Sequence, residues 1–316
     1  MSLGAWLRDT VHRGLFSSQT FEFFQRFKIN ITKNYHYSPI PDARTLREKN
    51  IWQYETKLYG LNLREAEQLA HTERVVSSYR NECDFALKSA EIPYQYYMRN
   101  GTYGWLCATI YHSLIRYYKP RKLIEIGAGS STYVSARAAM MNKKDGFDTQ
   151  VYAVDPFPSP ILQKGFPGLV EVLTKKAEDL APEFYLSLED GDILFIDSTH
   201  TVKTAGDVTY LFLEILPRLN PGVLIHVHDI FWPQDYPRKF LLDNHYFWAE
   251  QYLLQAFLAF NEHFEILWAG NYLPSKYPEK IQEIFPLMGG VSQQEAIVKY
   301  RLHYSSNSFW MRRVKS

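Results

Sequence analysis

The chain has little of what several classes of protein require. It has two cysteines in 316 residues, too few for a disulfide framework or a four-thiolate zinc site. Lys plus Arg number 35 and Asp plus Glu 34, so no excess of one charge favours nucleic acid or an anionic membrane surface. No apolar run approaches the roughly 18 residues of a membrane-spanning helix, and the first residues lack a signal-peptide pattern. We therefore expect a cytoplasmic protein with no nucleic-acid or membrane partner.

The first third of the chain has few strand-like apolar runs. Hydrophobic residues make up 46% of the whole sequence, enough for a large core in one large or two modest domains. Residues 1–100 favour short helices, for example over 20–27 and 63–88, joined by irregular loops. Pro39 and Pro41 fix φ twice, which predicts an extended strap or a simple linker. We interpret this region as a helical N-terminal extension.

Residues 101–316 have an α/β pattern, in which short continuous apolar runs alternate with helical periodicity. Residues 208–219 carry apolar side chains at the spacing of a core-facing helix, and a longer helix is expected over 245–261. Such alternation indicates βαβ units around a buried, doubly wound parallel sheet. The strand candidates are 122–126, 151–154, 169–173, 192–196, 222–227, 264–268 and 308–314.

A glycine pair follows the first of these strands and precedes a helix. Gly127 and Gly129 let the backbone turn tightly and approach a ligand, and the helix start offers free N–H groups to an anion. A dinucleotide fingerprint would have a third glycine where Thr132 stands. Asp155 ends the next strand, where an acid can bind both hydroxyls of a ribose. The alternatives are a turn without a ligand and a carboxylate that only caps its loop.

Two further polar segments follow the fourth and fifth strand candidates. One carries Asp197 and His200, and the other carries His226, His228 and Asp229. Adjacent strands lie about 4.8 Å apart, so side chains at neighbouring strand ends can converge on one ion. We predict a divalent site formed by Asp197, His228 and Asp229, with Mg²⁺ or Mn²⁺ favoured by the carboxylates. Loop capping is the alternative for the two acids, and His226 is expected to pack in the core.

Taken together, these motifs resemble the class I S-adenosylmethionine-dependent methyltransferases, and most closely the branch called methyltransferase family 24. The resemblance implies a Rossmann-like seven-stranded sheet of order 3-2-1-4-5-7-6 with strand 7 antiparallel, preceded by the N-terminal extension. The motifs that carry it are Glu125 to Thr132, Asp155, Phe195-Ile196-Asp197 and Pro221-Gly222-Val223.

The same resemblance implies a set of cofactor contacts. The glycine loop would face the methionine moiety of S-adenosylmethionine, with Glu125 near its amino group. Asp155 would bind the ribose, and the segment after the third strand would contact the adenine. The implied cofactor-binding residues are Glu125, Gly127, Gly129, Ser130, Ser131, Asp155, Ala177, Glu178 and Asp197.

The two polar segments are also similar to those of metal-dependent O-methyltransferases, including catechol and macrolide-sugar methyltransferases. These enzymes have an Asp after strand 4, an acidic or amide pair after strand 5, and a basic residue three positions after the first Asp. His200 has that place, which implies a general base beside Asp197. This chain departs from the pattern in having His228 where an acid often stands. The implied reaction is methylation of a hydroxyl oxygen on a small molecule or sugar.

Two rival functions are weighed against this one. A nicotinamide-dependent oxidoreductase could share the fold, but Thr132 replaces the third glycine of a dinucleotide-binding fingerprint. A non-catalytic scaffold that binds S-adenosylmethionine would not need Asp197, His200 and Asp229 together. The acceptor is not named by the sequence, and a homo-oligomer is left open, with the aromatic-rich extension as its candidate contact surface.

Overall fold

The computed structural model describes residues 11–89, 92–286 and 306–314. The chain divides into two compact units, of which the first comprises residues 1–53 and 237–247 and the second comprises residues 54–236 and 248–316. The domain boundary expected near residue 100 stays a prediction, while the compact units divide at residue 53.

The first unit consists of short helices, and side chains cap the starts of two of them. The Ser17 hydroxyl accepts a hydrogen bond from the Thr20 N–H, and the Asp42 carboxylate accepts one from the Thr45 N–H at 2.8 Å. Such caps satisfy N–H groups that a helix start leaves without a partner. Its elements are α2 (Ser18–Gln25), α3 (Ala43–Lys49), a 3-10 turn (Ile51–Gln53) and α10 (Arg238–Leu242).

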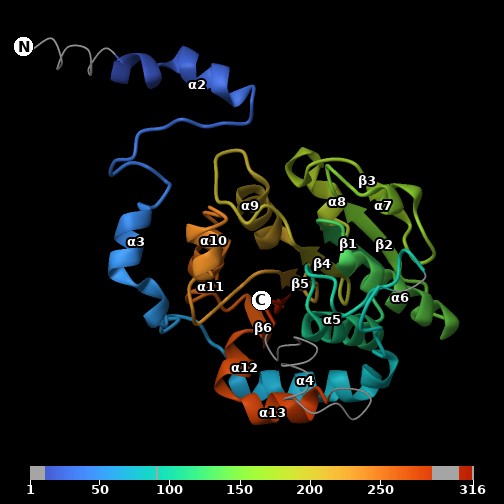
Figure 1. Cartoon of the computed structure of the whole chain (residues 1–316). Coiled ribbons are helices and arrows are strands. Elements are labelled where there is room, and N and C mark those ends of the chain that lie inside the picture. The colour runs from blue at the N-terminus through green and yellow to red at the C-terminus, as the bar shows by residue number, and fades with distance from the viewer. Residues whose placement is uncertain (1–10, 90–91, 287–305, 315–316) are drawn as a thin grey trace, which may run out of the picture. The chain divides into compact units, whose positions relative to one another are not determined.

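The second unit is built on one seven-stranded sheet of order β3-β2-β1-β4-β5-β7-β6 (Figure 1). Strands β1 to β5 run parallel, and β7 is antiparallel to both β5 and β6. The predicted fold and strand order are therefore confirmed. The strands are β1 (Lys122–Ile126), β2 (Gln150–Val154), β3 (Glu171–Leu173), β4 (Ile193–Ile196), β5 (Leu224–Val227), β6 (Phe264–Ala269) and β7 (Phe309–Arg313).

Helices cover both faces of this sheet, because alternate strand residues point to opposite sides. Leu123 and Phe195 pack into one core with α4, α5, α6 and α13, whereas Ile124 and Leu194 pack into another with α8, α9 and α11. The helices of this unit are α4 (Glu65–Tyr79), α5 (Trp105–Tyr118), α6 (Ser130–Lys144), α7 (Pro160–Lys164), α8 (Pro182–Leu186), α9 (Asp207–Tyr210), α11 (Glu250–Leu258), α12 (Tyr272–Lys276) and α13 (Pro278–Ile284).

Three predicted helices are shorter than their patterns indicated. The helix expected over 63–88 is α-helical only as α4, which ends at Tyr79 and is followed by a 3-10 turn (Arg80–Glu82). The apolar stripe over 208–219 is α-helical only as α9 and continues as a π turn (Leu211–Ile215) and a 3-10 turn (Leu216–Arg218). Pro217 lies in the 3-10 turn and has no N–H for a regular helical bond. The helix expected over 245–261 begins only at Glu250, because His245 has a left-handed φ of 57°. None of the helices in the described ranges is long and apolar enough to cross a membrane.

His226 packs in the core as expected. Its side chain is 0% exposed, and its ring stacks on Phe195 with a centroid separation of 3.9 Å. Neither ring nitrogen has a hydrogen-bond partner among the described residues. Burial, reinforced by the charge of His228, lowers the pKa of His226 well below its ordinary value. His226 is therefore a neutral core residue.

Candidate active site

The glycine loop between β1 and α6 lies directly against the end of β4. Gly127 has a φ of 81°, and a Cβ added there would come within 2.0 Å of the Asp197 carbonyl oxygen. Gly129 has open space on its Cβ side, with no described atom within 4 Å. The Gly129 N–H donates to the Thr132 hydroxyl at 3.0 Å, so the residue in place of a third glycine caps α6.

Glu125 anchors this loop from behind. Its buried carboxylate accepts hydrogen bonds from the hydroxyls of Ser131, Thr132 (3.0 Å) and Ser135 (3.0 Å), and from Tyr111 at 3.3 Å. Burial, only partly offset by the hydroxyl donors, raises the pKa of Glu125 to about 7. The carboxylate thus fixes the first turn of α6. A contact with the amino group of a bound ligand stays a prediction.

The remaining predicted cofactor residues lie at the start of α6 and after β2 and β3. The Ser130 hydroxyl lies 3.1 Å from that of Thr102, at the start of the segment before α5. Asp155 follows β2 and ties its end to the loop, since its two oxygens accept the N–H groups of Ala128 (3.0 Å) and Phe157 (2.7 Å). Ala177 and Glu178 lie in a 3-10 turn (Ala177–Asp179) after β3. The loop and Asp155 are therefore in direct contact.

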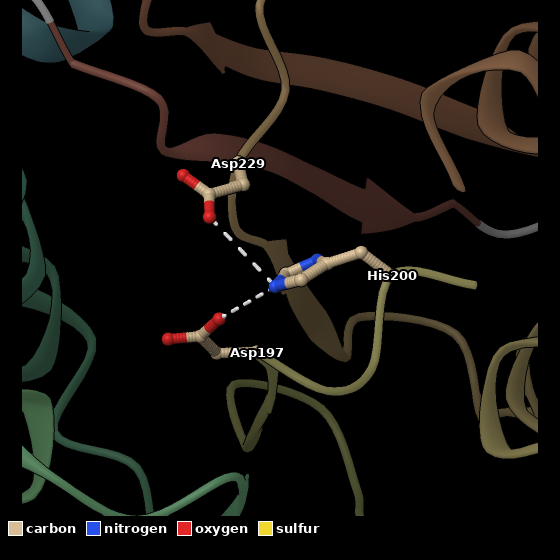
Figure 2. Close-up of side chains that lie close together, drawn as sticks. All are labelled: Asp197, His200 and Asp229. Carbon is tan, nitrogen blue, oxygen red and sulfur yellow. Dashed lines mark ion pairs between the residues drawn. The ribbon is translucent and has the colours of Figure 1, made fainter. Parts of the chain in front are cut away.

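A cluster of ionisable side chains lies at the ends of β4 and β5. Asp197 and Asp229 follow two strands that pair in register, with Ile196 opposite Val227. Figure 2 shows the imidazole of His200 between the two carboxylates. Its Nε2 atom is 3.3 Å from Asp197 Oδ1 and 3.7 Å from Asp229 Oδ2. The left-handed φ of 56° at His200 reverses the chain after β4 and brings the ring back to the strand ends.

The structure places His200 between the two acids, and it places His228 beside Asp229 at a longer distance. Ligand atoms of Asp197, His200 and Asp229 lie within 4.8 Å of one another, the one such group of possible metal ligands among the described residues. Two carboxylates and an imidazole suit a divalent transition metal such as Mn²⁺ better than Mg²⁺. The predicted third ligand, His228, instead packs its ring against Tyr103 at 5.0 Å, although its Nε2 is 3.9 Å from Asp229 Oδ1.

A further carboxylate, missed by the sequence analysis, lies behind His200. Glu250 Oε2 is 2.8 Å from His200 Nδ1, and Glu250 is 0% exposed. Burial opposes a charged His200, but its hydrogen bonds to Asp197 and Glu250 and their charges raise its pKa well above the ordinary value. Glu250 opens a helix, where a glutamate is common, so no sequence signal distinguishes it.

The positive environment of Asp197 has the opposite effect on that acid. Burial opposes its ionisation, yet the charge of His228 and the hydrogen bond from His200 lower the pKa of Asp197 below its ordinary value. On the other side of the cluster, the Asn307 amide donates to Asp229 Oδ1 at 2.6 Å. The ionised Asp197 carboxylate can therefore attract a cation or a polar substrate group, and Asp229 is fixed beside it by Asn307.

Comparison with known proteins agrees with this fold and loop. A family model described as a methyltransferase domain matches residues 124–230, from β1 to just beyond β5. Over 165 residues the chain is 31% identical to an uncharacterized protein of Archaeoglobus fulgidus, and this match covers 50% of the chain and 73% of that protein. The chain belongs to the class I S-adenosylmethionine-dependent methyltransferases.

One solved structure compared with this methyltransferase is described as the CmcI-N160 apo-structure. It is 15% identical in sequence, with a TM-score of 0.35, and the match covers 67% of this chain and 72% of that one. The cofactor of the methyltransferase family is S-adenosylmethionine, and the glycine loop suits it. A Cβ at Gly129 would meet open space beside the start of α6, and a contact of this loop with the methionine moiety stays a prediction.

Proposed function

We propose that this methyltransferase transfers a methyl group to a hydroxyl oxygen of a small molecule or sugar. One observation carries the proposal: His200 Nε2 and the carboxylates of Asp197 and Asp229 converge beside the glycine loop. A hydroxyl is a weak nucleophile until its proton is removed, and an imidazole next to the methyl donor is suited to that task. Methyl transfer to an already nucleophilic thiol would need no such cluster.

Each side chain has a distinct part in this proposal. The Gly127–Gly129 loop and the α6 start bind the methionine part of the donor, and Asp155 binds its ribose. Asp197 and Asp229 hold a divalent cation without His200 as a ligand, which leaves the Nε2 lone pair of His200 for the acceptor hydroxyl. His200 accepts the hydroxyl proton at Nε2. When bound, S-adenosylmethionine supplies an electrophilic methyl group and the cation lowers the pKa of the hydroxyl.

The cation and the base support each other electrostatically. A base must be neutral before it accepts a proton, and the carboxylates around His200 favour its protonated form. Positive charge bound to Asp197 and Asp229 offsets those carboxylates and therefore favours the neutral ring. Positioning of donor and acceptor in one dry site supplies much of the remaining acceleration.

The proposal is tested with S-adenosylmethionine labelled in its methyl group and a panel of sugars, phenols, amines and thiols. Transfer is measured after exhaustive chelation and after Mg²⁺ or Mn²⁺ is added back. We expect label on hydroxylated acceptors, with stimulation by the cation. Label found only on amines or thiols would contradict O-methylation. NAD in place of S-adenosylhomocysteine in a thermal-shift assay is the control for the donor.

A further inference from the structure

We infer that Glu250 is a positioning residue. It holds the His200 imidazole so that Nε2, rather than Nδ1, faces Asp197 and Asp229 and accepts the proton. This inference rests on the proposed function and deepens it. Glu250 Oε2 lies 2.8 Å from Nδ1, on the side of the ring opposite the two acids. Glu250 is 0% exposed and His200 is 5% exposed, so water does not compete for this contact.

The start of α11 holds the backbone of His200 as well as its ring. The N–H groups of Ala249 and Glu250 donate to the His200 carbonyl at 2.9 and 3.2 Å. On the preceding residue, the Thr199 N–H and hydroxyl bind the Asp207 carboxylate at 2.9 and 2.6 Å. These contacts maintain the left-handed conformation of His200, which is unfavourable for an L-residue.

The ring contacts leave one useful orientation. In a neutral imidazole one nitrogen carries the proton and the other carries a lone pair. A carboxylate that accepts Nδ1–H fixes this tautomer and directs the lone pair of Nε2 away from itself. Trp248 packs against the same ring with a centroid separation of 4.2 Å, which restricts its rotation. When a cation on Asp197 and Asp229 favours the neutral ring, the lone pair of Nε2 therefore points to the space between these two acids.

The carboxylate of Glu250 is directed to His200 and not to a wider network. Its second oxygen, Oε1, is buried and has no hydrogen-bond partner among the described residues. Burying a carboxylate with so few hydrogen-bond donors is unfavourable unless the interaction with its partner, here His200, offsets the loss of hydration. Glu250 is the first residue of α11, where the helix dipole favours a negative charge. The dipole alone does not require that this carboxylate contact His200.

A double-mutant cycle separates positioning from simple stabilisation. Glu250→Gln keeps the size of the side chain and can present an amide N–H to Nδ1, which favours the wrong tautomer. Turnover is measured for Glu250→Gln, His200→Ala and the double variant, with an acceptor that the panel identifies. Gln251→Ala is the matched control, since Gln251 is also buried on α11 but bonds the Phe231 N–H at 3.1 Å.

If Glu250 acts through His200, Glu250→Gln lowers turnover. The loss does not exceed that of His200→Ala, which is roughly 10²–10⁴-fold for removal of a general base. Glu250→Gln leaves the KM for the donor nearly unchanged, and it costs nothing further once His200 is alanine. Gln251→Ala should have the same effect in both backgrounds. An equal loss from Glu250→Gln with and without His200 would overturn the inference.

A second measurement needs no acceptor. Protein labelled with ¹⁵N-histidine and saturated with S-adenosylhomocysteine should show a strongly deshielded, slowly exchanging Nδ1 proton by NMR. This signal should be absent in His200→Ala and shifted or lost in Glu250→Gln. Its absence from the wild-type spectrum overturns the inference even if hydroxyl methylation is found. If no acceptor is methylated, the proposed function fails while the spectra still decide the positioning role.

Discussion

Substitution by alanine should have different effects at the two glycines of the glycine loop: it should lower stability at Gly127 and ligand affinity at Gly129. In Gly127→Ala the new Cβ would come 2.0 Å from the Asp197 carbonyl oxygen, and φ is 81°. Left-handed backbone costs an alanine roughly 1–2 kcal/mol, and overpacking adds about 1–3 kcal/mol. The expected loss of roughly 2–5 kcal/mol is large beside the 5–15 kcal/mol or so of a typical domain.

Gly129→Ala is the matched control. A Cβ added at Gly129 would have no described atom within 4 Å, and the φ of −173° is extended backbone that alanine adopts. Its stability should change by no more than about 0.5 kcal/mol. The methyl group would instead stand at the start of α6, where the donor approaches. Affinity for S-adenosylhomocysteine should therefore fall by about tenfold or more, equivalent to about 1.4 kcal/mol.

Thermal unfolding and calorimetry separate the two effects. At about 2–4 °C per kcal/mol, Gly127→Ala should lower the Tm by roughly 4–20 °C, while Gly129→Ala should keep it within about 2 °C. Titration with S-adenosylhomocysteine then reports affinity for each variant that stays folded. A wild-type Tm for Gly127→Ala would refute the close approach of loop and strand. Wild-type affinity for Gly129→Ala would refute the placement of the donor at this glycine.

Three further predictions concern side chains of the site. Asp155→Ala should weaken binding of S-adenosylhomocysteine by about 10- to 150-fold, and calorimetry showing no change would remove its ribose role. Because the pKa of Glu125 is raised from 4.5 to about 7, the folded chain binds more protons than the unfolded one in this window. The free energy of unfolding should thus fall as pH rises from 4.5 to 7, by up to about 1.4 kcal/mol per pH unit. Wild type and Glu125→Gln with the same dependence of Tm on pH would contradict this. His200→Ala should lower turnover by about 10²–10⁴-fold and leave donor affinity unchanged. Asp197→Ala should also abolish stimulation by the cation. Full activity after chelation would exclude a role for the metal but not the role of His200 as base.

The strands of the sheet could be predicted because each one is marked by a pattern of neighbouring residues in the sequence. Each central strand is a short, continuous apolar run, since both faces of a parallel sheet are buried. The glycine pair and Asp155 could be predicted for a similar reason: strand ends in such a sheet share one edge. The order of the strands came from a resemblance of motifs, and the structure has the same order.

The details of the acid cluster depend on contacts that are distant in sequence. His226 and His228 are two residues apart at the end of β5, so both face the same side of the sheet, and this period could have argued against His228 as a ligand. The position of the His200 ring depends on a single left-handed residue and on Glu250, fifty positions later. No periodicity or spacing signals such a pair.

The order in which the strands pair also affects how the protein is made. Strand β6 pairs with β7 alone, and β7 lies between β5 and β6 although it follows both in the chain. During synthesis, β5 can join β4, but β6 has no partner in the sheet until residues 309–313 have emerged. The same late segment brings Asn307, 78 positions after Asp229, to that carboxylate. The glycine loop can thus form on a nascent chain well before the acid cluster is complete, because Asn307 and β7 are synthesised about 80 residues after Asp229.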